Sequence, residues 1–373
     1  MATVKKDPTR KKTPWLVRWR DDAGVQRKKG FARRVDADRF RAEIEHKLNT
    51  GTYIDPAGGR RVFREYAEAW RESQPHRPNT AARHRSQLAK HVYPVLGDRP
   101  LAALRPSELQ AFITGLSATL SPGSVRTVWA SVRAVLAAAI RDRLIGHDPA
   151  VGVKMPEKPR EQVVPLTVDQ VDKLVRAAPD HYRHLVTVAA ATGLRQGELF
   201  GLQVDDVDFE GRAITLDRQV QPARGGGVLV GPLKNRASYR TIPVGTVVVN
   251  ALRAHLKAQP AEGKEFVFRT PAGDPLSRNT FNANVWRPLA ERAGMTGVGM
   301  HDLRHFYASA LIRAGLNPKV VATRLGHANA AMTLNTYSHL WPDDEDRTRQ
   351  AVDQLMLPAS LPACLPASLP VQS

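Results

Sequence analysis

The sequence predicts a mostly α-helical protein with small β-sheets, an α+β chain built from two or three domains. Its length of 373 residues exceeds that of one ordinary domain. Apolar residues recur at helical spacing through much of the chain, whereas strand-like alternation is confined to short stretches. Hydrophobic residues make up 42% of the composition, which is enough for packed cores and too much for general disorder.

The N-terminal segment predicts strands followed by a helix. Trp15, Val17 and Trp19 alternate with Leu16, Arg18 and Arg20, a strand-like period of two. A turn is expected at 21–24, and residues 25–31 can form a returning strand. A helix is expected over 36–48. A basic β-ribbon can lie in a DNA groove, although an ordinary small sheet with a solvated cationic face would have the same pattern. The candidate DNA-binding residues are Arg18, Arg20, Arg27, Lys28 and Lys29.

Residues 60–150 predict helices only. Three are expected at 62–74, about 80–95 and 109–116, and a fourth begins after Ser121 and Pro122, which supply a cap and a first-turn proline. The fourth carries an apolar stripe at spacings of three and four, and we assign this stripe to the core rather than to a cofactor site. Its members are Val125, Trp129, Val132, Leu136 and Ile140.

The charge of the chain indicates a nucleic-acid partner. The formal net charge is +19, and residues 1–50 and 60–155 each hold 15 Lys and Arg against 7 Asp and Glu. The single cysteine, Cys364, cannot form a disulfide within the chain. No apolar stretch predicts a transmembrane helix or a signal peptide. We therefore expect a cytoplasmic protein that binds DNA or RNA and has no membrane partner.

Four short motifs in the second half of the chain carry side chains suited to phosphate chemistry. The first is Thr192–Leu199, which contains Arg195. A hairpin is expected over 230–244, with Lys234 near its turn. The remaining motifs follow it along the chain, and they are His301-Asp302-Leu303-Arg304-His305, Leu325-Gly326-His327 and Thr336-Tyr337-Ser338-His339.

In this order the elements resemble the catalytic domain of the tyrosine recombinases, the family of phage integrases, Xer proteins and Cre-like enzymes. The resemblance covers roughly residues 163–345. It implies a site-specific DNA recombinase that works without a metal ion, ATP or another cofactor and holds the cut strand as a 3′-phosphotyrosine. The catalytic residues that it implies are Arg195, Lys234, His301, Arg304, His327 and Tyr337.

The resemblance also implies a role for each residue. Arg195 and Arg304 would hold the non-bridging oxygens of the scissile phosphate, because a guanidinium binds phosphate bidentately and stays charged. Tyr337 would attack phosphorus. His301 would help to handle the tyrosine proton, and His327 would donate a hydrogen bond to the phosphate.

Lys234 would protonate the leaving 5′ oxygen as a general acid. Arg236 and Arg240 stand close to it in sequence, so the hairpin register leaves this choice open. Among the tyrosines, Tyr307 and Tyr239 are alternatives to Tyr337. We prefer Tyr337 because its Thr-Tyr-Ser-His setting, ten residues after His327, is typical of the family.

Metal-dependent chemistry is the other possibility that these residues raise. His301 and His305 are four residues apart, but no third ligand is spaced to complete a metal site. Asp205, Asp206 and Asp208 could suggest a two-metal nuclease, yet they precede what looks like a turn between strands. We therefore expect no metal.

The resemblance extends to the outer regions of the chain. Residues 1–57 resemble the β-β-β-α arm-binding domain of lambda-type integrases, and residues 60–150 resemble the helical, SAM-like core-binding domain. Residues 151–165 would be a proline-rich linker, 166–345 the catalytic domain, and 346–373 a low-complexity tail without an assigned function.

The resemblance implies that the chain integrates and excises a phage or another mobile element. Double-stranded DNA attachment sites and a homotetramer on DNA are the implied partners, and an excisionase and a host DNA-bending protein are candidates. Three alternatives stay open: a Xer-like chromosome-dimer resolvase, a type IB topoisomerase-like relaxase, and a catalytically dead DNA-binding regulator.

Overall fold

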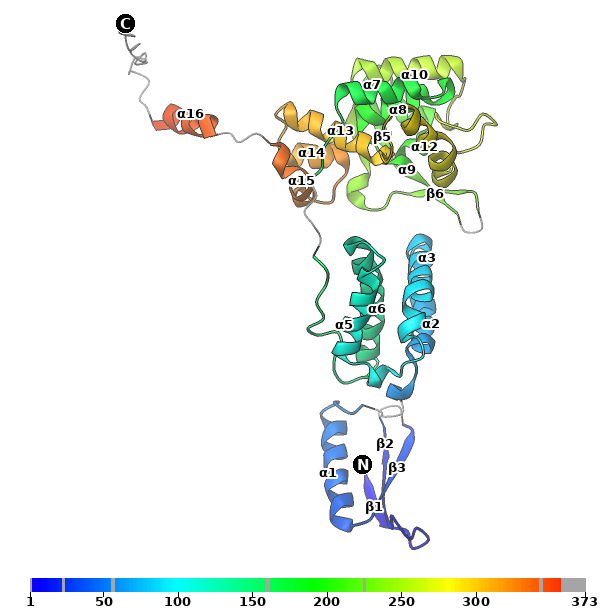
Figure 1. Ribbon diagram of the computed structural model, residues 1–373, viewed down its shortest axis with the longest axis vertical. Helices are drawn as coiled ribbons and strands as arrows, with labels where there is room; N and C mark the ends of the chain where they lie inside the picture. The colour runs from blue at the N-terminus through cyan, green and yellow to red at the C-terminus, as the bar shows by residue number, and fades with distance from the viewer. Residues whose placement is uncertain are drawn as a thin grey trace. The chain divides into compact units, whose positions relative to one another are not determined.

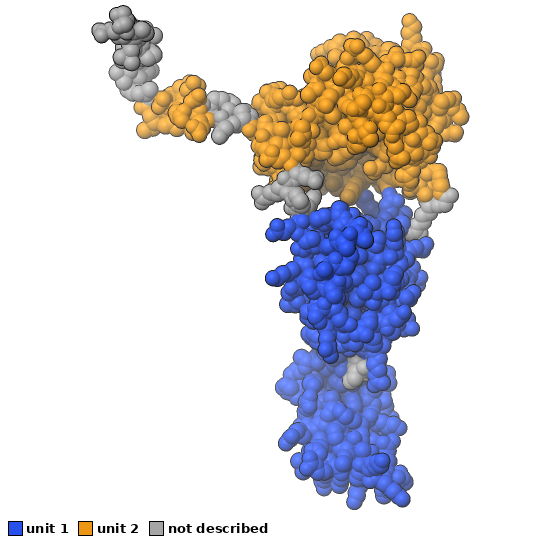
Figure 2. All heavy atoms as spheres, viewed as in Figure 1, with its two compact units in different colours: residues 1–160 blue, residues 161–373 orange. Residues whose placement is uncertain are grey.

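The computed structural model consists of two compact units, residues 1–160 (unit 1) and residues 161–373 (unit 2) (Figure 2). No helix of the described residues is long and apolar enough to cross a membrane. Apart from the side chain of Arg347, the structure describes residues 2–21, 24–54, 58–157, 162–223, 226–341 and 345–356.

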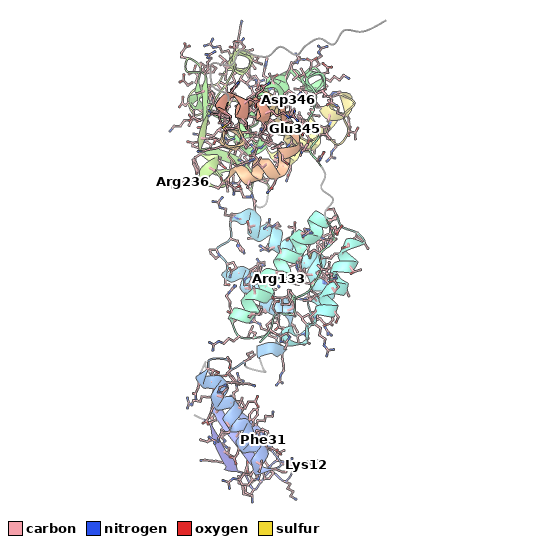
Figure 3. All side chains as sticks on the ribbon, turned by 90° about the vertical axis from the view of Figure 1, so that its left-hand side faces the viewer. Lys12, Phe31, Arg133, Arg236, Glu345 and Asp346 are labelled. Atoms are coloured by element: carbon pink, nitrogen blue, oxygen red, sulfur yellow. The ribbon has the colours of Figure 1, made fainter. Side chains whose placement is uncertain are left out.

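Unit 1 begins with a three-stranded antiparallel sheet and one helix (Figure 1). Val17 and Trp19 are buried with Ala37 and Ile44 of the helix, and Arg18 and Arg20 are exposed, as the alternation predicts; Leu16 is buried as well and departs from it. Phe31 ends the last strand, and its ring meets Phe40 at a centroid distance of 5.1 Å (Figure 3). The elements are β1 (Thr3–Lys6), β2 (Trp15–Arg20), β3 (Gln26–Phe31) and α1 (Arg34–Asn49), and the strand order is β1-β2-β3.

The rest of unit 1 is helical, as predicted. The longest helix is α6 (Pro122–Arg141), and Ser121 caps it by accepting a hydrogen bond from the Ser124 amide at 3.4 Å. Its apolar stripe is buried against the other helices, and Arg133 on its outer side pairs with Asp148 at 2.6 Å (Figure 3). The other elements are η1 (Gly58–Arg60), α2 (Phe63–Ser73), α3 (Pro78–Gln87), η2 (Leu88–Val92), α4 (Tyr93–Leu96), η3 (Leu101–Ala103) and α5 (Pro106–Ser117).

Unit 2 has a large helical core with small sheets at one side (Figure 1). Helix α7 (Val168–Ala177) starts with a capping box, in which Thr167 and Gln170 each accept a hydrogen bond from the other's amide. The helices of this core are α8 (Asp180–Thr192), α9 (Gln196–Phe200), η4 (Val204–Asp206), α10 (Thr246–Ala258), α11 (Arg278–Phe281), η6 (Asn282–Trp286) and α12 (Arg287–Arg292).

The strands of unit 2 correct one prediction. The hairpin expected over 230–244 is wrong, because the strands that flank Lys234 have different partners. One sheet has the order β4-β5-β8, and the other is a hairpin of β6 and β7. Alternation along a strand predicts which residues face the core, but it does not identify the neighbouring strand. The strands are β4 (Val207–Asp208), β5 (Ala213–Leu216), β6 (Arg218–Pro222), β7 (Val228–Pro232) and β8 (Arg240–Pro243), and η5 (Arg236–Ser238) lies between the last two.

The C-terminal helices of unit 2 form a second, smaller core around Tyr337. Helices α14 and α15 pack on each other, and α13 packs on both α8 and α14. Residues 357–373, which include the low-complexity repeat, lie outside the described residues. The elements are α13 (Met300–Arg313), α14 (Pro318–Leu325), α15 (Ala330–Tyr337), η7 (Ser338–Leu340) and α16 (Glu345–Met356).

Candidate active site

Arg304 lies on the buried side of α13 and is held by main-chain carbonyls. Only 2% of its surface is exposed. Its guanidinium donates to the carbonyl oxygen of Gly193 at 2.8 Å and to that of Leu325 at 2.6 Å. Burial and the nearby charge of Arg195 lower the pKa of Arg304 to about 9, so it remains charged at pH 7. The side chain therefore stands as a fixed cation between the ends of α8 and α14.

Gly193 makes this arrangement possible. It ends α8 in the left-handed conformation, with φ at 62°, which orients its carbonyl group beyond the helix. A Cβ atom there would lie 2.3 Å from the ring of Tyr307. Glycine is therefore required at this position both by its backbone angle and by the packed tyrosine ring.

Arg195 converges on the same turn as Arg304. It precedes α9 and donates to the carbonyl oxygen of Gly326 at 2.9 Å, next to the Leu325 carbonyl that Arg304 uses. It also pairs with Glu198 at 2.8 Å. The two arginines thus hold consecutive carbonyl groups directly before His327. The ion pair with Glu198, at the start of α9, fixes the same side chain.

Glu198 and Arg240 form a buried ion pair behind Arg195. Their side chains meet at 2.9 Å, and both are almost fully buried. Burial alone would raise the pKa of Glu198, but hydrogen bonds from Arg240 and the charge of Arg195 outweigh burial and lower it. Arg240 further donates to the carbonyl oxygen of Arg324 at 2.9 Å. The pair therefore ties β8 and α9 to the end of α14.

His327 follows the left-handed Gly326 that ends α14. Its Nδ1 lies 2.8 Å from Oγ1 of the buried Thr333 on α15. Burial and the charge of Arg304 lower the pKa of His327 to about 4, so the ring is neutral at pH 7. The contact with Thr333 therefore engages Nδ1 of this ring. The second ring nitrogen, Nε2, takes no part in that contact.

Tyr337 ends α15 and is 1% exposed. Its hydroxyl lies 2.7 Å from Nδ1 of His305, which directly follows Arg304 on α13. Burial raises the pKa of Tyr337 to about 12. His301 lies one turn before His305, and the two rings meet edge to face at 4.7 Å. Sequence reasoning paired His301 with the tyrosine proton, whereas the ring that contacts the hydroxyl is that of His305.

Lys234 is exposed in the segment that follows β7. None of the contacts described above involves its side chain. The same segment reaches the arginine cluster through Ser238, whose hydroxyl accepts from Arg195 at 3.4 Å and donates to Asn235. The structure therefore gathers Arg195, Arg304, His301, His327 and Tyr337 around one turn, and it places Lys234 on an adjacent loop.

The tyrosines considered as alternative nucleophiles and the aspartates considered as metal ligands have other contacts. Tyr307 packs its ring over Gly193, and Tyr239 is exposed. Asp206 is paired with Arg218 and accepts from the Gln203 amide. Asp208 accepts from the Gly211 amide at 2.7 Å. These aspartates stabilise the chain locally. Within the described ranges, no group of three His, Cys, Asp or Glu side chains is placed to hold a metal.

Sequence reasoning gave Glu198 no role, and it considered Arg240 only as an alternative to Lys234 and His305 only as a possible metal ligand. The spacing of Glu198, three residues after Arg195, is that of a residue that bonds back to a helix start, and its carboxylate accepts from the Arg195 amide at 3.0 Å. Arg240 shares the inward side of β8 with Ile242. An arginine at an inward strand position is the signal that could have identified this ion pair.

The five cationic candidates of unit 1 divide between the two faces of their sheet. Arg18, Arg20 and Lys28 are exposed on the face opposite α1, and Arg18 stands directly across from Lys28. Arg27 and Lys29 lie on the face that bears α1. Arg27 pairs with Asp21 at 2.9 Å, and the ammonium of Lys29 lies 4.5 Å from the centre of the Phe40 ring.

Known proteins share both the sequence pattern and the fold. The model of the phage integrase family matches residues 165–343, and the model of the phage integrase central domain matches residues 61–155. An integrase of Mycobacterium phage FRAT1 is 27% identical over 85% of this chain and 97% of that protein. The tyrosine recombinase XerD of Mycobacterium tuberculosis is 28% identical over 73% of this chain and 93% of that protein.

A solved structure adds the likeness in fold. A lambda integrase tetramer bound to a Holliday junction has a TM-score of 0.59 at 19% identity, and the match covers 90% of this chain and 96% of that one. The site and fold are those of an enzyme that cuts and rejoins DNA. This chain belongs to the phage integrase family and is a site-specific tyrosine recombinase. The predicted fold class, family and enzyme class are confirmed.

Proposed function

We propose that this chain integrates and excises a mobile DNA element by strand exchange between attachment sites, with Tyr337 as the nucleophile. The observation that carries the proposal is the convergence of Arg195 and Arg304 on the consecutive carbonyls of Leu325 and Gly326. His327 directly follows these carbonyls, and the hydroxyl of Tyr337 lies within hydrogen-bond distance of His305, the residue after Arg304.

Arg195 and Arg304 would bind the two non-bridging oxygens of the scissile phosphate. Both are positioned by bonds inside the protein, so little reorganisation is needed when the pentacoordinate transition state gains negative charge. Their planar guanidinium groups match phosphate oxygens bidentately. Two fixed cations in this position would supply the charge that a metal ion supplies in other phosphoryl-transfer sites.

His327 would donate a hydrogen bond to the same phosphate. When the Thr333 hydroxyl donates to Nδ1, the neutral ring carries its proton on Nε2, the form that can donate. Lys234 would protonate the leaving 5′ oxygen. Its exposed position on the loop that contacts Arg195 through Ser238 is compatible with an approach to bound DNA.

The phosphotyrosine ester would conserve the energy of the broken phosphodiester. A 5′ hydroxyl from a second duplex could then attack the ester and rejoin the strand without ATP. The lambda integrase of similar fold forms a tetramer on a Holliday junction, which supports a homotetramer on DNA for this chain. We place this reaction in the cytoplasm of a bacterial host, with an excisionase and a DNA-bending protein as candidate partners.

The sheet of unit 1 would bind separate arm-type sites with the face opposite α1. That face presents Lys5, Arg18, Arg20 and Lys28, all exposed. Residues on one face of a sheet project in the same direction, so a single DNA groove could meet all four. Arg27 and Lys29 on the other face would contribute less.

A covalent-trapping assay tests the proposal. Purified protein is mixed with nicked, labelled duplexes that span candidate attachment sites and is then denatured in SDS. We expect a protein-linked label with the natural chain and none with Tyr337→Phe, whose DNA binding persists because only one hydroxyl is removed. An adduct that persists in Tyr337→Phe would contradict the choice of nucleophile and direct attention to Tyr307.

The trapping assay and two further measurements separate the remaining alternatives. Tight binding without an adduct on any duplex would support a DNA-binding regulator. Relaxation of any supercoiled plasmid without recombination would support the relaxase. Integration that survives deletion of residues 1–57 would support a Xer-like enzyme that needs no arm sites.

A further inference from the structure

We propose that His305, and not His301, receives the phenolic proton of Tyr337 during cleavage and returns it during religation. This inference rests on the proposed role of Tyr337 as the nucleophile. It assigns a catalytic function to a residue that sequence reasoning considered only as half of a metal pair.

The contact between the two side chains is direct. Nδ1 of His305 lies 2.7 Å from the Tyr337 hydroxyl, and the centroids of the two rings are 5.5 Å apart. Tyr337 is 1% exposed, so bulk water does not compete freely for its proton. A proton acceptor must lie within hydrogen-bond reach of the proton it removes, and His305 meets this requirement.

His301 occupies a different position. Its ring meets the ring of His305 edge to face at 4.7 Å, one helical turn before it. His301 can therefore restrict the orientation of the His305 ring, but the contact with the hydroxyl belongs to His305.

The charges around His305 favour a neutral ring before cleavage. Burial lowers the pKa of His305, the carboxylate of Asp302 opposes this effect, and the charge of Arg304 adds to it. From the element that follows Tyr337, His339 directs its Nε2 to the carbonyl oxygen of Val163. At pH 7 the ring is thus neutral, and when the Tyr337 hydroxyl donates to Nδ1, the lone pair on that nitrogen is the acceptor. Asp302 lies near enough to stabilise the imidazolium that forms.

The proton balance of the step is complete. The phenolic oxygen of Tyr337 forms a bond to phosphorus as the bond from phosphorus to the 5′ oxygen breaks. The phenolic proton passes to Nδ1 of His305, and the leaving 5′ oxygen takes a proton from the proposed general acid, Lys234. In religation the 5′ hydroxyl returns that proton to Lys234, and the departing phenolate recovers its own proton from His305.

The pH dependence of His305→Gln tests this assignment. Glutamine can accept a hydrogen bond from the phenol but cannot take up its proton, so positioning is kept and proton transfer is lost. We expect the rate of adduct formation at pH 7 to fall by about 10²–10⁴-fold. The remaining rate should increase about tenfold per pH unit above pH 7, because the reaction then depends on the small fraction of phenolate.

His301→Gln is the matched comparison, one turn away on the same helix. We expect it to lower the rate while preserving the pH dependence of the natural chain, which should be flat near pH 7 and decline at lower pH as His305, whose pKa burial lowers, becomes protonated. The opposite pattern would overturn the proposal. In that pattern the rate of His301→Gln increases steeply with pH, whereas His305→Gln keeps the pH profile of the natural chain and a rate within threefold of it.

A substrate with sulfur in place of the 5′ bridging oxygen gives a test that does not depend on folding of the variants. Thiolate leaves without a general acid, so only removal of the phenolic proton remains to be titrated. With the natural chain, the rate should still decline as the pH falls below neutral and His305 becomes protonated. A profile that stays flat down to the lowest pH at which the protein remains folded would overturn the role of His305, whereas an adduct that persists in Tyr337→Phe would overturn the proposed nucleophile itself.

Discussion

The arginines of the catalytic unit and the cations of the N-terminal sheet have the same charge but opposite surroundings. Arg304 and Arg240 are almost fully buried and donate to main-chain carbonyls. Arg18, Arg20 and Lys28 are exposed on an open sheet face. The first group is fixed by bonds inside the protein, whereas the second is open to solvent.

This difference matches two kinds of work. Stabilising one phosphorus centre needs charges at fixed positions, because reorganisation during the reaction would raise the barrier. Binding a DNA backbone needs charges that displace condensed counterions, and hydrated, mobile side chains do this well. Changes in the first group should therefore act on stability and rate, and changes in the second on affinity and salt dependence.

The largest effect is expected from breaking the buried ion pair of Glu198. In Glu198→Ala, the buried guanidinium of Arg240 loses its charged partner, which typically costs about 3–5 kcal/mol in the free energy of unfolding. Urea denaturation of the variant measures this loss. A destabilisation under 1 kcal/mol would contradict the central role of the pair in this unit.

The double variant Glu198→Met with Arg240→Met separates the effect of the two buried charges from the effect of side-chain packing. Both charges are then absent, so no unpaired charge is left buried, and the loss of stability should be smaller than in Glu198→Ala. Adduct formation should still be impaired, because Arg195 would lose the carboxylate that holds it at 2.8 Å.

The pH dependence of stability follows from the same pair. The pKa of Glu198 is lowered in the folded chain, so its contribution is present above the ordinary value of 4.5 and is lost as the pH falls through the folded value. Natural protein should lose stability more steeply below pH 4.5 than the double methionine variant. Parallel stability curves for the two proteins would contradict this expectation.

Arg304→Lys should change the free energy of unfolding less than Glu198→Ala does, but it should have a large effect on the rate of adduct formation. A lysine keeps the charge but cannot form both bonds, to Gly193 and to Leu325, and still present a planar face to phosphate. We expect adduct formation to slow by about 10²–10³-fold, with DNA affinity changed little. Arg313→Lys, at the exposed end of the same helix, is the control and should keep the natural rate.

Much of the fold and of the site followed from the sequence because local patterns specify them. The stripe of α6, its Ser121 cap and the alternation of β2 depend on residues that are near neighbours in the chain. The order of motifs around Arg195, Arg304 and Tyr337 identified the family. These features are repeated at fixed spacing, so a single sequence is enough to show them.

Long-range pairing could not be predicted in the same way. β8 pairs with β5 and not with β7, and the choice depends on the partners available in three dimensions. Likewise Glu198 and Arg240 are 42 residues apart, and His305 and Tyr337 are 32 residues apart. No spacing rule connects residues at such distances, so only the folded chain brings these contacts together.

A comparison of the two faces of the N-terminal sheet tests which face binds DNA, and the expected change in affinity is smaller than the effects above. Arg18→Ala and Lys28→Ala should each weaken binding to arm-site DNA and reduce the slope of log affinity against log salt by about one. Lys29→Ala, on the face that bears α1, is the matched control and should leave the slope unchanged. Equal losses from Lys28→Ala and Lys29→Ala would indicate that the sheet does not meet DNA with one face.

The smallest effect is expected from removing divalent metal. If Arg195 and Arg304 supply the charge that stabilises the transition state, adduct formation should proceed at the same rate in EDTA as in Mg²⁺. The measurement is single-turnover cleavage of a nicked duplex at constant ionic strength, because a change in salt alone would alter binding through the N-terminal cations. Loss of cleavage in EDTA that Mg²⁺ restores would show that the fixed arginines do not suffice, and it would remove the distinction between fixed catalytic charge and mobile binding charge.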